Sequence, residues 1–140
     1  MFFAKLHPLL VQFPLALLAS GVLLEIYGKS QREETVIIAG RFNLQMGFWC
    51  ALVAAVVGAL GLSGLHVKQK SALGYHVFFA CATIILFAAA LRVQRVWNKK
   101  PGTILYFILL ISGFLSVLAT GYLGGELVYR FGIGTLHPIE

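Results

Sequence analysis

The sequence predicts an all-α membrane protein in which four transmembrane helices form an up-down bundle. Hydrophobic residues make up 59% of the chain and charged residues only 11%, whereas a soluble domain carries about 25% charged residues. A chain of 140 residues cannot hide this much apolar surface in one core, so much of it must face lipid. The charged residues also lie in clusters that are separated by four long uncharged runs.

Each uncharged run is long enough to cross a bilayer as a helix. About 20 residues at 1.5 Å rise each span the hydrocarbon core of ~30 Å, and a helix satisfies its own backbone groups in lipid. Short connections make neighbouring helices antiparallel, and no internal repeat or linker divides the chain. We therefore expect one transmembrane domain, residues 1–140, with spans built on Leu6–Leu24, Phe42–Val67, Ser71–Leu91 and Pro101–Gly125.

The basic residues lie at the ends of these runs and predict the orientation. Four crossings place both termini on one side, together with Lys5, Lys68, Lys70 and Arg130. The other side has more basic residues: Lys29, Arg32, Arg41, Arg92, Arg95, Lys99 and Lys100. The positive-inside rule then makes the second side cytoplasmic and the termini periplasmic, in an inner membrane. The pI of about 9.6 therefore reflects topology, and we expect a lipid bilayer as partner and no nucleic acid.

The first run is expected to remain as a helix, because no small-residue cleavage site follows it. One of its faces carries residues at helical spacing and is predicted to face the bundle interior: His7, Val11, Pro14, Leu18, Gly21 and Glu25. Pro14 is expected to kink the helix. Gln12 is expected to be buried with an interhelical hydrogen bond, and Glu25 is interpreted as an interfacial residue at the inner end of the span.

All four histidines fall on the side of the termini, which is the most informative feature of the sequence. Imidazoles at one depth in a helical bundle can bind haem iron as axial ligands. His7 and His76 lie near one level on the first and third spans, which are expected to be diagonal. We predict them as the axial pair of a b-type haem, with His66 and His137 as second choices. Glycines at this level would leave room for the ring: Gly121, Gly124 and Gly125.

Other interpretations of these polar residues stay open. Histidine is tolerated at membrane interfaces because its ring is amphipathic, so all four could be structural. A zinc site would need three or four ligands in a tetrahedral array, and the histidines form no local metal motif. Glu126 could serve a proton path, but an ion pair with Arg130 four residues on is favoured. No nucleophile–base pair or phosphate loop is present, so independent catalytic activity is not expected.

The two ends of the chain resemble a bacterial domain-of-unknown-function family of small four-helix membrane proteins. The resemblance rests on the opening from His7 to Leu17 (HPLLVQFPLAL), on His76, and on the closing Gly124–Tyr129 (GGELVY) with Gly132 and Gly134. Members typically carry a second histidine where this chain has Gln12. Some relatives are joined to, or encoded near, Rieske-type or cytochrome proteins, so the resemblance implies a redox setting and periplasmic or membrane redox partners.

Two functions follow as hypotheses. The first is a membrane-embedded, redox-associated subunit that binds one haem b near the outer face and serves an electron-transfer protein. The second is a structural or assembly subunit of a larger membrane complex, without a cofactor.

Overall fold

The computed structural model describes residues 2–62, 70–97 and 100–133, and in these residues every regular element is a helix. The elements are α1 (Phe2–Leu10), α2 (Gln12–Gln31), α3 (Glu34–Leu62), α4 (Lys70–Val96) and α5 (Lys100–Tyr129). The segments Phe2–Gln31, Glu34–Leu62, Ser71–Val96 and Lys100–Tyr129 are long and apolar enough to cross a membrane. The predicted all-α, four-span fold class is confirmed.

The first span is interrupted once, at Val11, between α1 and α2. The chain remains close to helical there, because Val11 N–H donates to His7 O at 3.0 Å and Leu15 N–H to Val11 O at 3.2 Å. Pro14 has no N–H to give to the preceding turn. The break therefore lies three residues before the proline at which a kink was expected.

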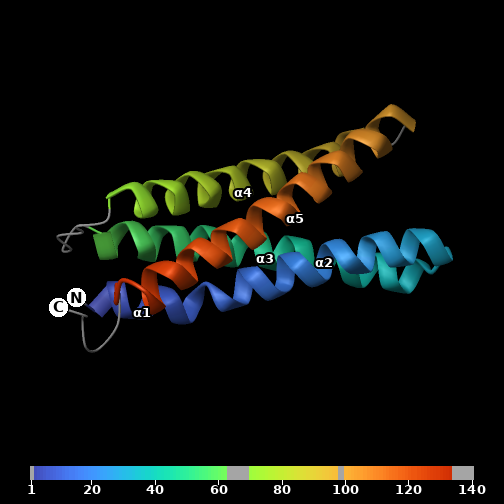
Figure 1. Ribbon diagram of the computed structural model, residues 1–140. Helices are drawn as coiled ribbons and strands as arrows, with labels where there is room; N and C mark the ends of the chain where they lie inside the picture. Colours follow the sequence, from blue (N-terminus) through green and yellow to red (C-terminus); the bar gives the residue numbers. More distant parts are fainter. Residues whose placement is uncertain (1, 63–69, 98–99, 134–140) are drawn as a thin grey trace.

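The helices form two antiparallel hairpins (Figure 1). The first pairs α1 and α2 with α3, and the second pairs α4 with α5. Contacts of α2 with α5 and of α3 with α4 join the hairpins, so the first and third spans are diagonal, as expected. The start of α1 and the end of α5 lie together at one end, here called the terminal end, and the hairpins diverge toward the other, the loop end.

The α2–α3 hairpin is held by reciprocal packing of leucine against glycine. A Cβ atom at Gly21 would lie 2.8 Å from Leu44 Cγ, and one at Gly47 would lie 2.9 Å from Leu18 Cγ. Both leucines are almost completely buried. Small residues at a helix interface let two backbones approach closely, which is a main source of association in lipid.

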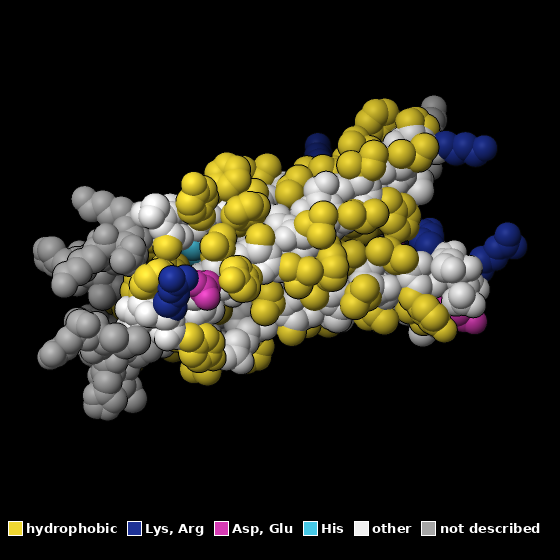
Figure 2. Space-filling model, viewed as in Figure 1, with side chains coloured by type: hydrophobic (Ala, Val, Ile, Leu, Met, Phe, Trp, Pro, Cys, Tyr) yellow, Lys and Arg dark blue, Asp and Glu magenta, His cyan; other side chains and the backbone are white. Residues whose placement is uncertain are grey.

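The outer surface is apolar along the length of the bundle, and charged side chains gather at its ends (Figure 2). Lys and Arg side chains project from the tips of both hairpins at the loop end. The side chains that form the core are buried between the hairpins: Leu18, Val22, Leu44, Phe87, Ala90, Tyr106, Leu110 and Val117.

Candidate functional site

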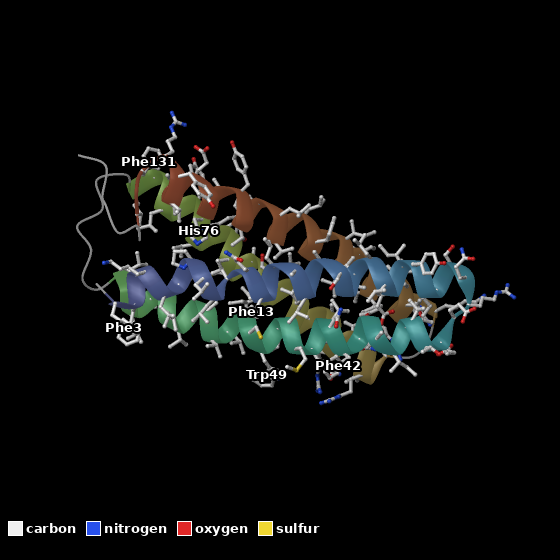
Figure 3. All side chains as sticks on the ribbon, turned by 90° about the horizontal axis from the view of Figure 1, so that it is seen from below. Phe3, Phe13, Phe42, Trp49, His76 and Phe131 are labelled. Atoms are coloured by element: carbon white, nitrogen blue, oxygen red, sulfur yellow. The ribbon has the colours of Figure 1, made fainter. Side chains whose placement is uncertain are left out.

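Two histidines from diagonal spans meet in the interior near the terminal end. The ring of His7, on α1, and the ring of His76, on α4, have centroids 6.3 Å apart and planes at 82°. Figure 3 shows His76 between α4 and the N-terminal span. Both side chains are half-buried. The structure thus brings together the two histidines that were predicted to lie at one level.

Both rings are oriented by a backbone carbonyl of the neighbouring helix. His7 Nδ1 lies 2.9 Å from the carbonyl oxygen of Ala54, and His76 Nδ1 lies 3.1 Å from that of Thr120. Since a carbonyl only accepts, Nδ1 carries the hydrogen and donates it in each ring. The Nε2 lone pair of each neutral imidazole is then free to bind a metal. Metal-binding histidines are commonly oriented in this way by their other nitrogen.

A glycine one helical turn beyond each carbonyl makes room for the ring. A Cβ at Gly58 would lie 2.8 Å from His7 Cε1, and a Cβ at Gly124 would lie 3.1 Å from His76 Cε1. Each hairpin therefore presents a histidine on its first span and a carbonyl and a glycine, four residues apart, on its second. The sequence did not reveal this repeat, because a carbonyl has no residue signature and a single glycine is a weak signal.

A cluster of three hydroxyl groups lies beside His76, between α4 and α5. Thr83 Oγ1 is 2.9 Å from Ser116 Oγ and 3.3 Å from Thr120 Oγ1. The Ser116 hydroxyl donates to Phe79 O at 3.0 Å, and the Thr120 hydroxyl donates to Ser116 O at 2.8 Å. The cluster fixes the register of α4 against α5, and with it the height at which His76 meets the Thr120 carbonyl.

Of the three glycines expected near the cofactor, only Gly124 lies against a histidine ring. A Cβ at Gly121 would meet Leu15, and one at Gly125 would meet only Tyr129 of the same helix. The second-choice ligands, His66 and His137, lie outside the described residues.

Glu126 and Arg130 form the expected ion pair, with 3.2 Å between Oε2 and Nη1 across one helical turn. Both side chains are partly exposed, at 33% and 69%. The expected ion pair is therefore present in the structure.

The prediction for Gln12 was wrong, because this side chain is exposed on the outer face. Gln12 follows His7 by five residues, which turns it about 140° around the helix from the interior face. A histidine at position 12 would point outward in the same way, so Gln12 leaves the His7–His76 pair intact.

Glu25 was also wrongly assigned to the interface. Its side chain is 0% exposed, and Oε1 accepts a hydrogen bond from Arg41 Nε at 3.0 Å. The signal was in the sequence, because Glu25 shares the face of Leu18 and Gly21 that was itself predicted to be interior. Its position near the end of an uncharged run suggested the interface instead.

The described residues hold no group of three or more His, Cys, Asp and Glu side chains arranged to bind a metal ion. The site that these residues define therefore offers two nitrogen ligands. Two axial nitrogens suit haem iron, whose other four ligands come from the macrocycle, better than a tetrahedral zinc ion.

Four long apolar helices, packed as two hairpins around a histidine pair, define a polytopic helical membrane protein. The chain belongs to the family described as "Predicted membrane protein (DUF2231)", whose family model matches residues 4–137. The expected family resemblance is thereby confirmed. No curated protein and no solved structure matches the chain. The family description supplies the membrane setting and names no activity.

Proposed function

We propose that this protein is a redox-associated membrane subunit that binds one b-type haem through His7 and His76. The haem would lie near the periplasmic face of the inner membrane and exchange electrons with a partner protein. The chain itself would have no independent catalytic activity. Its residues would bind the cofactor, fix the orientation of both axial rings and exclude water.

The observation that carries this proposal is the separation of the two rings. A bond from an imidazole nitrogen to a metal is about 2 Å long, so two rings on opposite sides of one iron have centroids roughly 6 Å apart. The centroids of His7 and His76 are 6.3 Å apart. Since both Nδ1 atoms are engaged with carbonyls, Nε2 is the ligand atom available on each ring.

The surroundings of the pair support the proposal by fixing both imidazole rings. The helices that flank the pair present small residues to the rings, namely Ala54 and Gly58 on α3 and Gly124 on α5, so each ring packs directly against backbone. These residues belong to a site built entirely on helices, which hold ligands more precisely than loops do.

The position of the pair indicates on which side a partner would act. Both histidines lie at the terminal end, and the basic tips of the hairpins are at the loop end. The positive-inside rule assigns the loop end to the cytoplasm. One haem at the periplasmic end cannot carry an electron across a core of ~30 Å, so donor and acceptor would both act at the periplasmic face. A periplasmic or membrane-bound redox protein fits this requirement.

One observation favours the alternative, a cofactor-free structural subunit. Each histidine ring already fills the space over a glycine and satisfies a backbone carbonyl. The two rings also meet edge to face, a favoured arrangement for aromatic pairs. In this role the pair would hold the two hairpins together.

The test is the haem content per chain of the detergent-purified protein and of three variants. The proposal predicts one haem per chain in the wild type and loss of haem in His7→Ala and in His76→Ala, with the helical circular dichroism retained. Gln12→Ala, an exposed polar residue on the same span, should bind as the wild type does. Wild-type protein that folds with haem available and contains none would leave the structural alternative.

A further inference from the structure

The outer face of α3 carries two polar side chains toward the loop end. Arg41 and Gln45 lie four residues apart, which places them on the same face of the helix. The side chain of Arg41 is 39% exposed, and Gln45 is exposed. Polar side chains within membrane spans usually face the bundle interior, where other protein groups satisfy them. Two such groups on the outer face therefore require a partner that is not part of this bundle.

The guanidinium of Arg41 is fixed on one side and has donors left on the other. Its Nε donates to the buried carboxylate of Glu25 at 3.0 Å. The Nη1 and Nη2 amino groups carry the other four N–H donors, and they have no hydrogen-bond partner among the described residues. A guanidinium that is already held in place loses little freedom on binding, and its amino groups match two oxygens of one phosphate.

The depth of Arg41 corresponds to the boundary of the hydrocarbon core. Gly40 packs against Glu25, and Gly61 packs against Ala4. These two contacts are about 30 Å apart along α3, which is the thickness of the core. Arg41 directly follows Gly40, and a long basic side chain that starts at this boundary extends its charge into the layer of lipid headgroups.

Below Arg41, the same face of α3 offers groups that match the rest of a phospholipid. The carboxamide of Gln45, about 6 Å deeper along the helix, has no hydrogen-bond partner in the part of the chain that the structure describes, so it is free to donate to a glycerol ester carbonyl. Deeper still, Trp49 lies on the outer side of α3 (Figure 3). It borders a shallow apolar hollow, which is lined by Trp49, Leu52, Val53, Val56 and Val57. From Arg41 to Leu52 the helix rises about 16 Å, and an acyl chain covers half of the ~30 Å core.

The charges at the loop end favour a lipid with a net negative headgroup. The exposed charged side chains described there are five basic and two acidic, namely Lys29, Arg32, Arg92, Arg95 and Lys100 against Glu33 and Glu34. Basic sites of this kind attract anionic lipids. A free phosphate ion would leave Gln45 and the hollow unused. A second copy of the chain, related by an axis along the membrane normal, would bring two positively charged ends together, which is unfavourable.

We propose that Arg41 and Gln45 form the binding site of one anionic glycerophospholipid in the leaflet at the loop end. Arg41 binds the phosphate through its amino groups, Gln45 donates to an ester carbonyl, and one acyl chain lies in the hollow beside Trp49. The site is independent of haem at the terminal end.

The experiment is native mass spectrometry of the detergent-purified full chain, titrated with phosphatidylglycerol. We expect one lipid per chain, bound about fivefold more tightly than zwitterionic phosphatidylcholine. Gln45→Leu should weaken binding about fivefold, because one hydrogen bond is lost, whereas Gln12→Leu removes an exposed carboxamide from another span and should have no effect. Arg41→Lys keeps the charge but loses the two-point contact, so it should weaken binding by about tenfold.

Four results would overturn the proposal. The first is equal affinity for the two lipids, and the second is equal affinity in Gln45→Leu and Gln12→Leu. The third is displacement of the lipid by an equal concentration of inorganic phosphate, which would make Arg41 a site for the free ion. The fourth is a dimer without lipid, which would make this face a contact between two copies. Gln45→Leu changes an exposed side chain and decides the matter if Arg41→Lys fails to fold.

Discussion

Adding one methyl group beside His7 should weaken haem binding, because it displaces the imidazole ring from its hydrogen bond. In Gly58→Ala the new Cβ would lie 2.8 Å from His7 Cε1 and 2.9 Å from Nδ1. Carbon atoms in contact are separated by about 3.5 Å or more, so the ring must move by roughly 0.7 Å. The hydrogen bond from Nδ1 to Ala54 O, now 2.9 Å, would lengthen by up to this amount, and at its upper limit of about 3.6 Å it is lost.

The cost can be stated for both stability and ligand binding. Loss of the bond with its donor left unpaired destabilises the fold by about 1–3 kcal/mol. Loss of the group that orients a metal ligand typically lowers metal affinity about 10–100-fold. Gly124→Ala should act in the same direction but less, because its Cβ would lie 3.1 Å from His76 Cε1.

Two other glycines provide controls, Gly125 on α5 and Gly74 on α4, the helix that carries His76. A Cβ at Gly125 would have its nearest neighbour at 3.9 Å, and one at Gly74 would have none within 4 Å. The assay is a haem titration of the detergent-purified apoprotein, followed by absorbance, with thermal unfolding measured on the same samples. The predicted order of affinity loss is Gly58→Ala, then Gly124→Ala, then the two controls. If Gly58→Ala binds haem and unfolds as Gly74→Ala does, then the glycine does not provide the space that orients His7.

Three further predictions follow from the described contacts. Arg41→Gln should destabilise the fold by up to about 3 kcal/mol, because it leaves the buried Glu25 carboxylate without its partner. Arg130→Gln, which breaks the exposed ion pair with Glu126, should change stability by under about 1 kcal/mol. Equal shifts of the thermal unfolding temperature in the two variants would contradict this. Thr83→Val should lower the free energy of unfolding by about 1 kcal/mol. The double variant Thr83→Val/Ser116→Ala should lose less than the sum of the two single losses, because both side chains belong to one cluster; a double-mutant cycle of unfolding free energies checks this. The ring planes of His7 and His76 are nearly perpendicular, at 82°. If both rings bind one ferric iron at this angle, neither plane favours one of the iron d orbitals over another, and the low-spin signal in electron paramagnetic resonance should be highly anisotropic. A rhombic signal would mean that the rings turn on binding.

The helical spans and their pairing could be predicted because they depend on regular features of the sequence. Uncharged runs of bilayer length fix the spans, and short connections fix the antiparallel order. The common level of His7 and His76 follows from their positions near the starts of the first and third spans, which run in the same direction in an up-down bundle. The interior face of the first span followed from helical spacing alone, and Pro14, Leu18 and Gly21 are buried as it predicted.

The finer features of the site depended on tertiary contacts that no local pattern encodes. Ala54 and Thr120 act through backbone carbonyls, which every residue has. Glu25 and Arg41 are 16 residues apart and meet only because Arg32, with a φ of 59°, ends α2 in a left-handed conformation and turns the chain back. Gln12 shows the opposite case, since its angular position on the helix already placed it away from the interior.

The central claim is that His7 and His76 bind one haem, and the absorption spectrum of the detergent-purified protein, oxidised and then reduced with dithionite, tests it most directly. We expect a Soret band and, on reduction, the sharp α and β bands of a six-coordinate b-type haem with two histidine ligands. A featureless spectrum from well-folded protein, expressed with haem available, would contradict it and leave the histidine pair as a contact between the two hairpins.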